Sequence, residues 1–434
     1  MKNTGFKIYL LIWLGTFISE IGTGMTSFAL GIYIYQLTDQ ASSSALVTLC
    51  AFLPGLLMTP WAGILADRYD RRLLMALGDG LSGLGVLWIY FSLQASQPSI
   101  PLICLGAALS SVFSALVSPA FRATISDLVS EDQISKATGL SQINGIARYL
   151  ISPTLAGLIL AHGHIGQILL IDFSTIFVTV ICSLVARRHI KNPFKGASHS
   201  FWGECKRGFQ IIHEKKGIWL LVLLGTAFSF FLGTVEILLS PMILGFASSQ
   251  EVGWIMAISS SGILFGGLFL STFAIKNHFH LILSLSLGLL GIFMAGMGSK
   301  ENLIWICFFG FLLFSSLPFA NTAIDYLIRL NINKREQGKA WGTIGIISQF
   351  GYVIAYASMG WVADTFFKPL LLPKGALASS IGSIIGVGSS RGYGLLLILA
   401  GICISFSALF LYRQTAIKEL EHLPQMSQKW YKSQ

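Results

Sequence analysis

The sequence predicts an all-α integral membrane protein in which twelve transmembrane helices form two bundles of six. Of its 434 residues, 54% are hydrophobic and only 11% are charged, whereas an ordinary soluble domain carries about 25% charged residues. The apolar residues form runs of membrane-spanning length, and the basic residues gather between alternate runs. This composition excludes a soluble enzyme, a disordered chain and a secreted disulfide scaffold.

The twelve apolar runs are each long enough to cross a bilayer, which requires roughly 20 mostly apolar residues. They show no strand-like alternation and are too long for barrel strands, so we interpret them as helices. We predict spans at 9–36, 41–66, 72–95, 99–121, 137–161, 167–187, 217–244, 252–275, 281–298, 303–328, 340–366 and 393–413.

One long basic segment after the sixth span divides the chain into halves. Phe201, Cys205, Phe209 and Ile212 share one helical face there, which favours an amphipathic helix on the inner membrane surface. Two halves of six spans suggest repeats with a site between them near the bilayer midplane. We therefore predict an N-terminal bundle at 1–187, a cytoplasmic linker at 188–216, a C-terminal bundle at 217–414 and a cytoplasmic tail at 415–434.

The distribution of basic residues predicts the orientation. Twenty-four of the 29 Lys and Arg residues lie in segments on the side of the N-terminus, and four lie on the other side. Both termini are therefore expected in the cytoplasm. The net charge of +10 follows from this topology, so it does not indicate nucleic acid. The six cysteines show no metal-ligand spacing, and we predict neither a metal nor a cofactor.

Ionisable side chains at membrane depth are expensive and usually functional. Glu20 lies about eleven residues, or roughly 16 Å of helix, from the inner end of the first span. It shares a helical face with Thr16, Thr23 and Ser27, which we expect to line a wet cavity. Arg148 lies at similar depth in the fifth span and is the natural partner of Glu20. Such a pair is either a fixed strut or a switch that a proton or a substrate breaks.

The seventh span offers a second protonation candidate, Glu236, nearer to the outer end. For the four aspartates in or near other spans, we favour local bonding or solvation at the membrane interface: Asp79, Asp172, Asp325 and Asp364. Aromatic residues would suit an apolar, ring-containing substrate, although ordinary packing explains each of them equally well. These cavity candidates are Phe17, Phe28, Phe230, Phe231, Tyr352 and Tyr356.

The loop between the second and third spans reads GILADRYDRRLL over residues 63–74. This short charged loop is a tight hinge, in which Asp67 can bind a helix N-terminus or a basic side chain. The segment resembles the conserved cytoplasmic loop of the major facilitator superfamily, with Asp70 where a glycine is usual. By this resemblance, a latch would hold the two bundles together on the inner side, formed by Gly63, Asp67, Arg68, Arg71 and Arg72.

Other stretches resemble a branch of that superfamily, the exporters of the macrolide-efflux and enterobactin type. These are VSPAFRATISDLV at 117–129 and ARYLISPTLAGLIL at 147–160. Pro153 and Gly157 resemble the fifth-span motif of drug–proton antiporters and would form a hinge, although Ser152 replaces the usual glycine.

The resemblance implies a proton-coupled exporter of amphipathic organic compounds that works by alternating access. It would act as a monomer in the bacterial cytoplasmic membrane, with a small-molecule substrate, protons and the lipid bilayer as partners. Protonation of Glu20 would release Arg148 or a cationic substrate, and no ATP-binding loop is present. A dedicated siderophore or metabolite exporter, an importer and a sensor that transports nothing remain alternatives.

Overall fold

The computed structural model describes residues 2–188, 201–273, 277–333 and 336–421. These residues form helices and no strand, and twelve of the helical segments are long and apolar enough to cross a membrane. The predicted all-α, twelve-span fold class is confirmed. The chain separates into two compact units, one comprising Met1–Ser198 and Ser248–Ala257 and the other His199–Ala247 and Ile258–Gln434.

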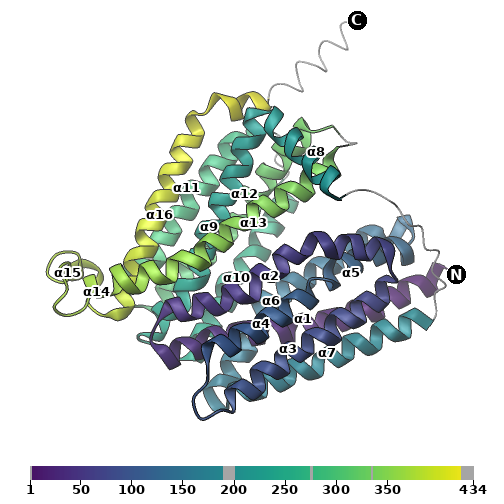
Figure 1. Cartoon of the computed structure of the whole chain (residues 1–434). Coiled ribbons are helices and arrows are strands. Elements are labelled where there is room, and N and C mark those ends of the chain that lie inside the picture. Colours follow the sequence, from purple (N-terminus) through teal and green to yellow (C-terminus); the bar gives the residue numbers. More distant parts are fainter. Residues whose placement is uncertain (1, 189–200, 274–276, 334–335, 422–434) are drawn as a thin grey trace, which may run out of the picture. The chain divides into compact units, whose positions relative to one another are not determined.

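The first six spans are built from seven helices and one 3₁₀ turn (Figure 1). The fourth span is interrupted at Ala115 and Leu116, because Pro119 cannot donate an amide hydrogen to the carbonyl four residues before it. The predicted span at 99–121 is confirmed as the membrane-length segment Ile100–Ile125, which contains this break. The elements are α1 (Lys2–Thr38), α2 (Ala41–Arg68), α3 (Arg71–Leu93), α4 (Ile100–Ser114), α5 (Val117–Leu128), η1 (Glu131–Gln133), α6 (Ile134–His162) and α7 (Ile165–Arg188).

The rest of the chain contains the other six spans and several shorter elements. One of these is η2, a single π-helical segment that continues directly from α13. The elements are α8 (Phe201–Glu214), α9 (Lys216–Leu244), α10 (Ser249–Thr272), α11 (Phe279–Ser299), α12 (Leu303–Asn331), α13 (Gln337–Val362), η2 (Ala363–Phe367), α14 (Lys368–Leu370), α15 (Gly382–Ile385) and α16 (Ser389–Arg413).

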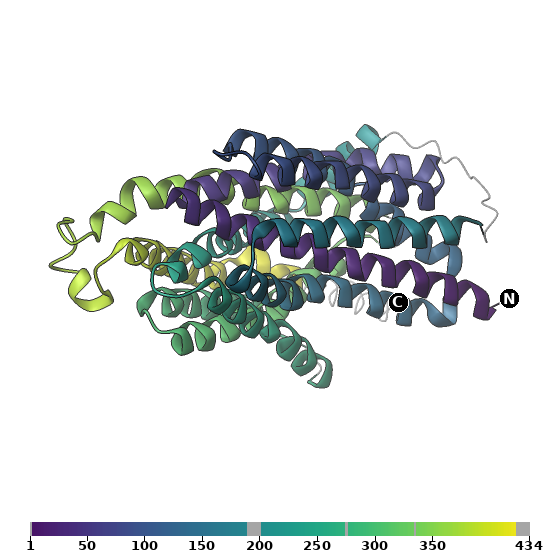
Figure 2. The same ribbon diagram turned by 90° about the horizontal axis from the view of Figure 1, so that it is seen from below.

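Within the first unit, α1 packs against α6 and α7, and α3 packs against α4 and α7. Figure 2 shows these purple-to-blue helices running side by side. One core cluster includes Leu30, Val86 and Ile168, and another includes Tyr9, Met75 and Phe121. The helices thus bury an apolar interior while large side chains such as Phe91 and Ile181 stay exposed, as expected for surfaces that face lipid.

Glycines allow close helix contacts in the second unit, where α9 packs on α13 and α11 packs on α16. A side chain added at Gly351 of α13 would collide with the backbone of α9 at Thr226 and Phe230. A side chain added at Gly291 of α11 would likewise collide with the carbonyl oxygen of Gly401 in α16. Without a hydrophobic driving force between helices in lipid, such close van der Waals contacts supply much of the association energy.

The predicted linker segment contains helix α8, which packs against α13 and α9. Ile212 of α8 is fully buried, whereas the ring of Phe209 stacks on His213 and meets Trp219 edge-on. Arg207 forms an ion pair with Glu336, with 2.7 Å between Nη2 and Oε1. The side chains of Phe201 and Cys205 and residues 189–200 lie outside the described part of the chain, and the membrane-surface placement of this helix stays a prediction.

The segment between α14 and α16 packs around a buried arginine, Arg391, at the start of α16. The Arg391 side chain is fully buried and donates from Nη2 to the Gly298 carbonyl at 2.8 Å. Gly386 takes a φ of 100°, a conformation that favours glycine, directly against the Arg391 side chain. Tyr393 donates to Asp364 in η2 at 2.9 Å, which fastens the segment at its other end.

The start of the predicted tail forms a helix over residues 415–421. Glu421 accepts hydrogen bonds from the backbone amides of His278, Phe279 and His280 at the start of α11, and His280 Nδ1 lies 2.5 Å from its Oε2. Burial alone would raise the pKa of Glu421, but these hydrogen bonds outweigh it and hold the pKa below its ordinary value. The carboxylate thus caps α11 from a distant part of the sequence.

Candidate functional site

The structure brings Glu20 of α1 and Arg148 of α6 together. Nη1 of Arg148 lies 3.5 Å from Oε2 of Glu20, and each side chain is 42% exposed. Both residues lie well inside hydrophobic helices that are long enough to span a membrane. A half-exposed ion pair at such a position can be opened by a proton or by a charged ligand, since neither partner is locked into a tightly packed core.

Residues of the predicted polar stripe on α1 form hydrogen bonds with two neighbouring helices, α6 and α7. Thr16 is buried and accepts a hydrogen bond from Asn144 of α6 at 3.2 Å. Thr23 donates to Asp172 of α7 at 3.3 Å. Ser27 is exposed and donates to the carbonyl of Thr23. The stripe therefore anchors α1 within its own bundle as much as it presents polar groups to solvent.

Two further carboxyl groups lie inside the same bundle, on α3 and α7. Asp79 is 7% exposed and Asp172 is 1% exposed. Asp79 interacts electrostatically with both Glu20 and Asp172, and Asp172 also interacts with Arg148. The sequence favoured local bonding or solvation at the membrane interface for these two aspartates; their burial excludes solvation, whereas Asp172 does form a hydrogen bond with Thr23. Their depth along their own helices gave no signal that α1, α3 and α7 bring them together.

The second unit carries a separate polar and aromatic face on α9 and α13. The Tyr356 hydroxyl donates to Oε2 of Glu236 at 2.6 Å, and Glu236 is exposed whereas Tyr356 is buried. The ring of Tyr352 lies 5.8 Å from that of Tyr356, and Phe230 meets Phe231 edge-on at 5.4 Å. The phenol donor thus helps to hold the Glu236 carboxylate in place.

Two aromatic candidates of the first unit have packing partners. The ring of Phe17 stacks on Trp13 at 5.4 Å, and the Trp13 indole donates to the carbonyl of Leu140 in α6. Phe28 packs against the apolar core cluster of its own bundle. Packing therefore accounts for Phe28, whereas Phe17 is half-buried beside the Glu20 region of α1.

Two aspartates hold the charged loop between α2 and α3 in place, Asp70 in the loop itself and Asp127 on α5. Asp70 caps α3 by accepting from the amide of Arg72 at 3.1 Å, and it pairs with Arg187 of α7 at 2.8 Å. Asp127 of α5 lies 2.6 Å from Arg71 and 3.7 Å from the fully buried Arg72. These contacts all lie within the first unit.

The other predicted latch residues lie at the end of α2. Asp67 and Arg68 are exposed, and Gly63 is half-buried with open space beside it. A latching role for this group stays a prediction.

The predicted hinge residues on α6 contact the start of α10, which belongs to the first unit. A side chain added at Gly157 would lie 2.9 Å from the carbonyl oxygen of Ser249 and 3.3 Å from Cα of Gly253. Gly253 in turn lies directly against the carbonyl of Pro153. The two helices approach so closely only because both carry glycine at the crossing point.

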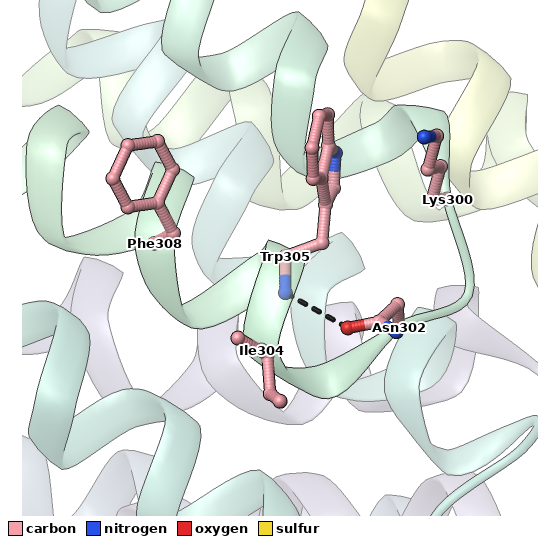
Figure 3. A pocket seen from close by; sticks show the side chains of 5 residues that line it. All are labelled: Lys300, Asn302, Ile304, Trp305 and Phe308. Carbon is pink, nitrogen blue, oxygen red and sulfur yellow. Dashed lines mark hydrogen bonds between the residues drawn. The ribbon is translucent and has the colours of Figure 1, made fainter.

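A pocket of about 450 Å³ lies at the loop between α11 and α12 (Figure 3). The Lys300 ammonium lies 4.4 Å from the centre of the Trp305 ring, and Asn302 caps α12 by accepting from the Trp305 amide at 3.0 Å. Ile304 and Phe308 complete its apolar lining. Lys and Trp at a helix end are typical of a membrane interface. Within the described ranges, no group of three His, Cys, Asp or Glu residues could hold a metal ion.

Comparison with known sequences places these features in context. The sequence model of the Major Facilitator Superfamily matches residues 12–356. Macrolide efflux protein A of Streptococcus pyogenes is 25% identical over 373 residues, which cover 84% of this chain and 91% of that protein. Enterobactin exporter EntS of Shigella boydii is 24% identical over 414 residues, which cover 93% of each protein.

Solved transporter structures share the fold at low sequence identity. A bacterial homologue of the human lysosomal transporter Spinster, in an inward-facing and unoccupied conformation, gives a TM-score of 0.71 at 13% identity and covers 98% of this chain and 99% of its own. A D-xylose–proton symporter gives 0.66 at 12% identity, covering 94% of this chain and 97% of its own.

Proposed function

Because the chain belongs to the Major Facilitator Superfamily, it is a transporter and not an enzyme, and we propose that it exports amphipathic organic compounds by proton-coupled alternating access. The observation that carries this proposal is the Glu20–Arg148 pair. Protonation of Glu20 would remove its charge and weaken its attraction for Arg148, so that a proton could change the state of the bundle.

The substrate class is proposed from the relatives and from the aromatic side chains. Two of the relatives are a macrolide efflux protein and an enterobactin exporter, both of which act on large organic molecules. Tyr352, Phe230 and Phe231 would offer aromatic surface to such a molecule, and Glu236 would attract a cationic group.

A dedicated siderophore exporter is the second candidate, since the likeness to the enterobactin exporter extends over 93% of the chain. Direction of transport needs its own test, because the same fold also serves a D-xylose–proton symporter.

The topology belongs to the same proposal. We propose that both termini lie in the cytoplasm of a bacterial cell and that the chain acts as a monomer in the inner membrane; the distribution of the basic segments supports this orientation. In this arrangement the loop at 63–74 would latch the inner side, and the close contact at Pro153 and Gly157 would be the hinge about which α6 moves.

Transport into inverted membrane vesicles tests the proposal. We would add a panel of dyes, a macrolide and an iron-free catecholate siderophore to the outside of the vesicles. We would then impose a pH gradient that is acid inside and measure the accumulation of each compound in the vesicles. We expect at least one compound to accumulate and the accumulation to disappear when the gradient is collapsed. If collapse of the gradient leaves the transport of every active compound unchanged, the proposed proton coupling is wrong.

Matched variants then test the role of the pair. Glu20→Gln should abolish the dependence of transport on the gradient while the protein still inserts. Glu214→Gln makes the same chemical change at the exposed end of α8, outside the spans, and should leave transport unchanged. Unaltered gradient dependence in Glu20→Gln would remove Glu20 from the mechanism.

A further inference from the structure

Two carboxyl groups in the first bundle are buried, one on α3 and one on α7. Oδ2 of Asp79 is fully buried and receives no hydrogen bond. Asp172 is 1% exposed and interacts with the hydroxyl groups of Thr23 and Thr26 of α1. Gly22 makes this approach possible, because a side chain there would collide with Thr175 and with Asp172. The aspartates are therefore packed against neighbouring helices and do not face water.

The charges around this pair are mostly acidic. Asp79 interacts with Glu20 of α1 and Asp172 of α7, and both of these neighbours are carboxyl groups. Asp172 interacts with Glu20 and with Arg148 of α6. Among the other helices packed on α3, α4 contains no acidic or basic residue. The charged residues of α2 and α5 lie at or near the loops, at Asp67, Arg68, Arg122 and Asp127.

The balance of charge in the bundle determines whether the Asp79 and Asp172 carboxyl groups are ionised or protonated. One guanidinium serves three carboxyl groups, and Arg148 already lies 3.5 Å from Glu20. If Asp79 and Asp172 were both ionised, the buried region would hold two negative charges without compensation. Burying an unpaired carboxylate is far more expensive than burying the neutral acid. The cluster becomes neutral when Glu20 pairs with Arg148 and each aspartate carries a proton.

We propose that Asp79 and Asp172 form a buried proton-binding site next to Glu20, in which the transported proton is stored. This inference rests on the proposed proton coupling. Glu20, which is half-exposed, exchanges protons with water, and Asp172 shares both Thr23 and Arg148 with the Glu20 region. When Glu20 takes up a proton, Arg148 becomes available to Asp172, whose own proton can then leave. Proton uptake at one carboxyl group is thereby linked to release at another.

Infrared spectroscopy of the full chain in lipid nanodiscs tests for the stored protons without a substrate. A protonated carboxyl group gives a C=O stretch that is separate from those of ionised carboxylates and amides. We expect the wild type to show this band at neutral pH, and Asp79→Asn and Asp172→Asn each to lose about half of its intensity. Asp325→Asn is the matched control, because Asp325 is 46% exposed and ion-paired with Arg329.

The outcomes separate this inference from the proposed function. Absence of the band at neutral pH, or its full survival in both Asn variants, overturns the proton-binding site. Full gradient-driven transport in both variants overturns it as well, because stored protons would then have no part in coupling. If the band behaves as expected but no compound responds to a pH gradient, the proposed function fails, and with it the coupling role of the site, whereas the binding of protons by the two aspartates is supported. Asparagine matches aspartate in size, and a single symmetric peak in size-exclusion chromatography verifies folding.

Discussion

The contact in which Glu421 caps the start of α11, called the Glu421 clamp below, gives a sharp prediction about the second unit. The helix over residues 415–421 is too short to persist alone, so it stays helical only while it is docked. Its docking depends on Glu421, whose side chain is 9% exposed and accepts from three consecutive amides of α11 and from His280. The Leu420 carbonyl accepts one further hydrogen bond, from Nδ2 of Asn331 at 2.7 Å. Glu421→Gln should therefore release this helix.

The magnitude follows from the hydrogen bonds to the charged carboxylate. Each such bond is worth about 1.5–3 kcal/mol, and glutamine keeps one neutral acceptor oxygen. We expect a net loss of about 2–3 kcal/mol, which shifts the equilibrium between docked and undocked helix by roughly 30- to 150-fold. Amide hydrogen–deuterium exchange over residues 415–421 should accelerate by that factor at neutral pH, since exchange there reports local opening.

The neighbouring Glu419 provides the control. It lies on the same helix but is exposed, so Glu419→Gln should leave exchange unchanged. Equal protection in Glu421→Gln and wild type would refute the clamp, and equal acceleration in both variants would show a general loss of helix propensity. The pKa of Glu421 lies below its ordinary value, so its contribution is complete above that value and is lost only as the pH falls through the lowered pKa. Acidification within the physiological range should leave the clamp closed.

Three further predictions concern stability and are measured by thermal unfolding in detergent. Asp127→Asn removes the carboxylate that pairs with Arg71 at 2.6 Å and lies 3.7 Å from the fully buried Arg72, and it should cost about 3 kcal/mol. Asp325→Asn breaks an exposed pair one helical turn apart and should cost about 0.5 kcal/mol; equal effects would contradict this ranking. Gly351→Ala forces α13 away from α9 and should cost about 1–3 kcal/mol, but Gly345→Ala, with open space beside it, should stabilise the helix by up to about 1 kcal/mol. Arg391→Met removes a charged donor to a buried carbonyl and should cost about 1–2 kcal/mol; a raised Tm would show that the desolvation penalty of the guanidinium dominates instead.

The sequence predicts the twelve spans well because hydropathy and length are properties of each segment alone. It also indicates that Glu20 and Arg148 lie at the same depth, which is sufficient to suggest a pair. The burial of Asp79 and Asp172 was not predicted, because burial depends on which helices are neighbours and the adjacency of α3 and α7 is absent from local patterns. The clamp by Glu421 was missed for the same reason, since its partners lie more than 140 positions away in the chain.

The charged loop shows a related limit. Asp70 replaces the glycine that is usual in this motif, and the sequence marked the position only as a departure. In the structure it both caps α3 and binds Arg187, so the substitution adds an anchor between α3 and α7. A motif predicts the backbone turn, whereas a departure from the motif acquires meaning only from the partner that the fold supplies.

The π-helical segment η2 has a consequence for aligning this chain with its relatives. A π turn contains one residue more than an α turn, so it rotates everything that follows by about 100° relative to an uninterrupted helix. Asp364 lies in this segment and meets Tyr393, and Lys368 and Pro369 of α14 follow it. Relatives with a regular helix here should therefore align with a one-residue gap at 363–367, and an ungapped alignment would compare side chains that face different directions.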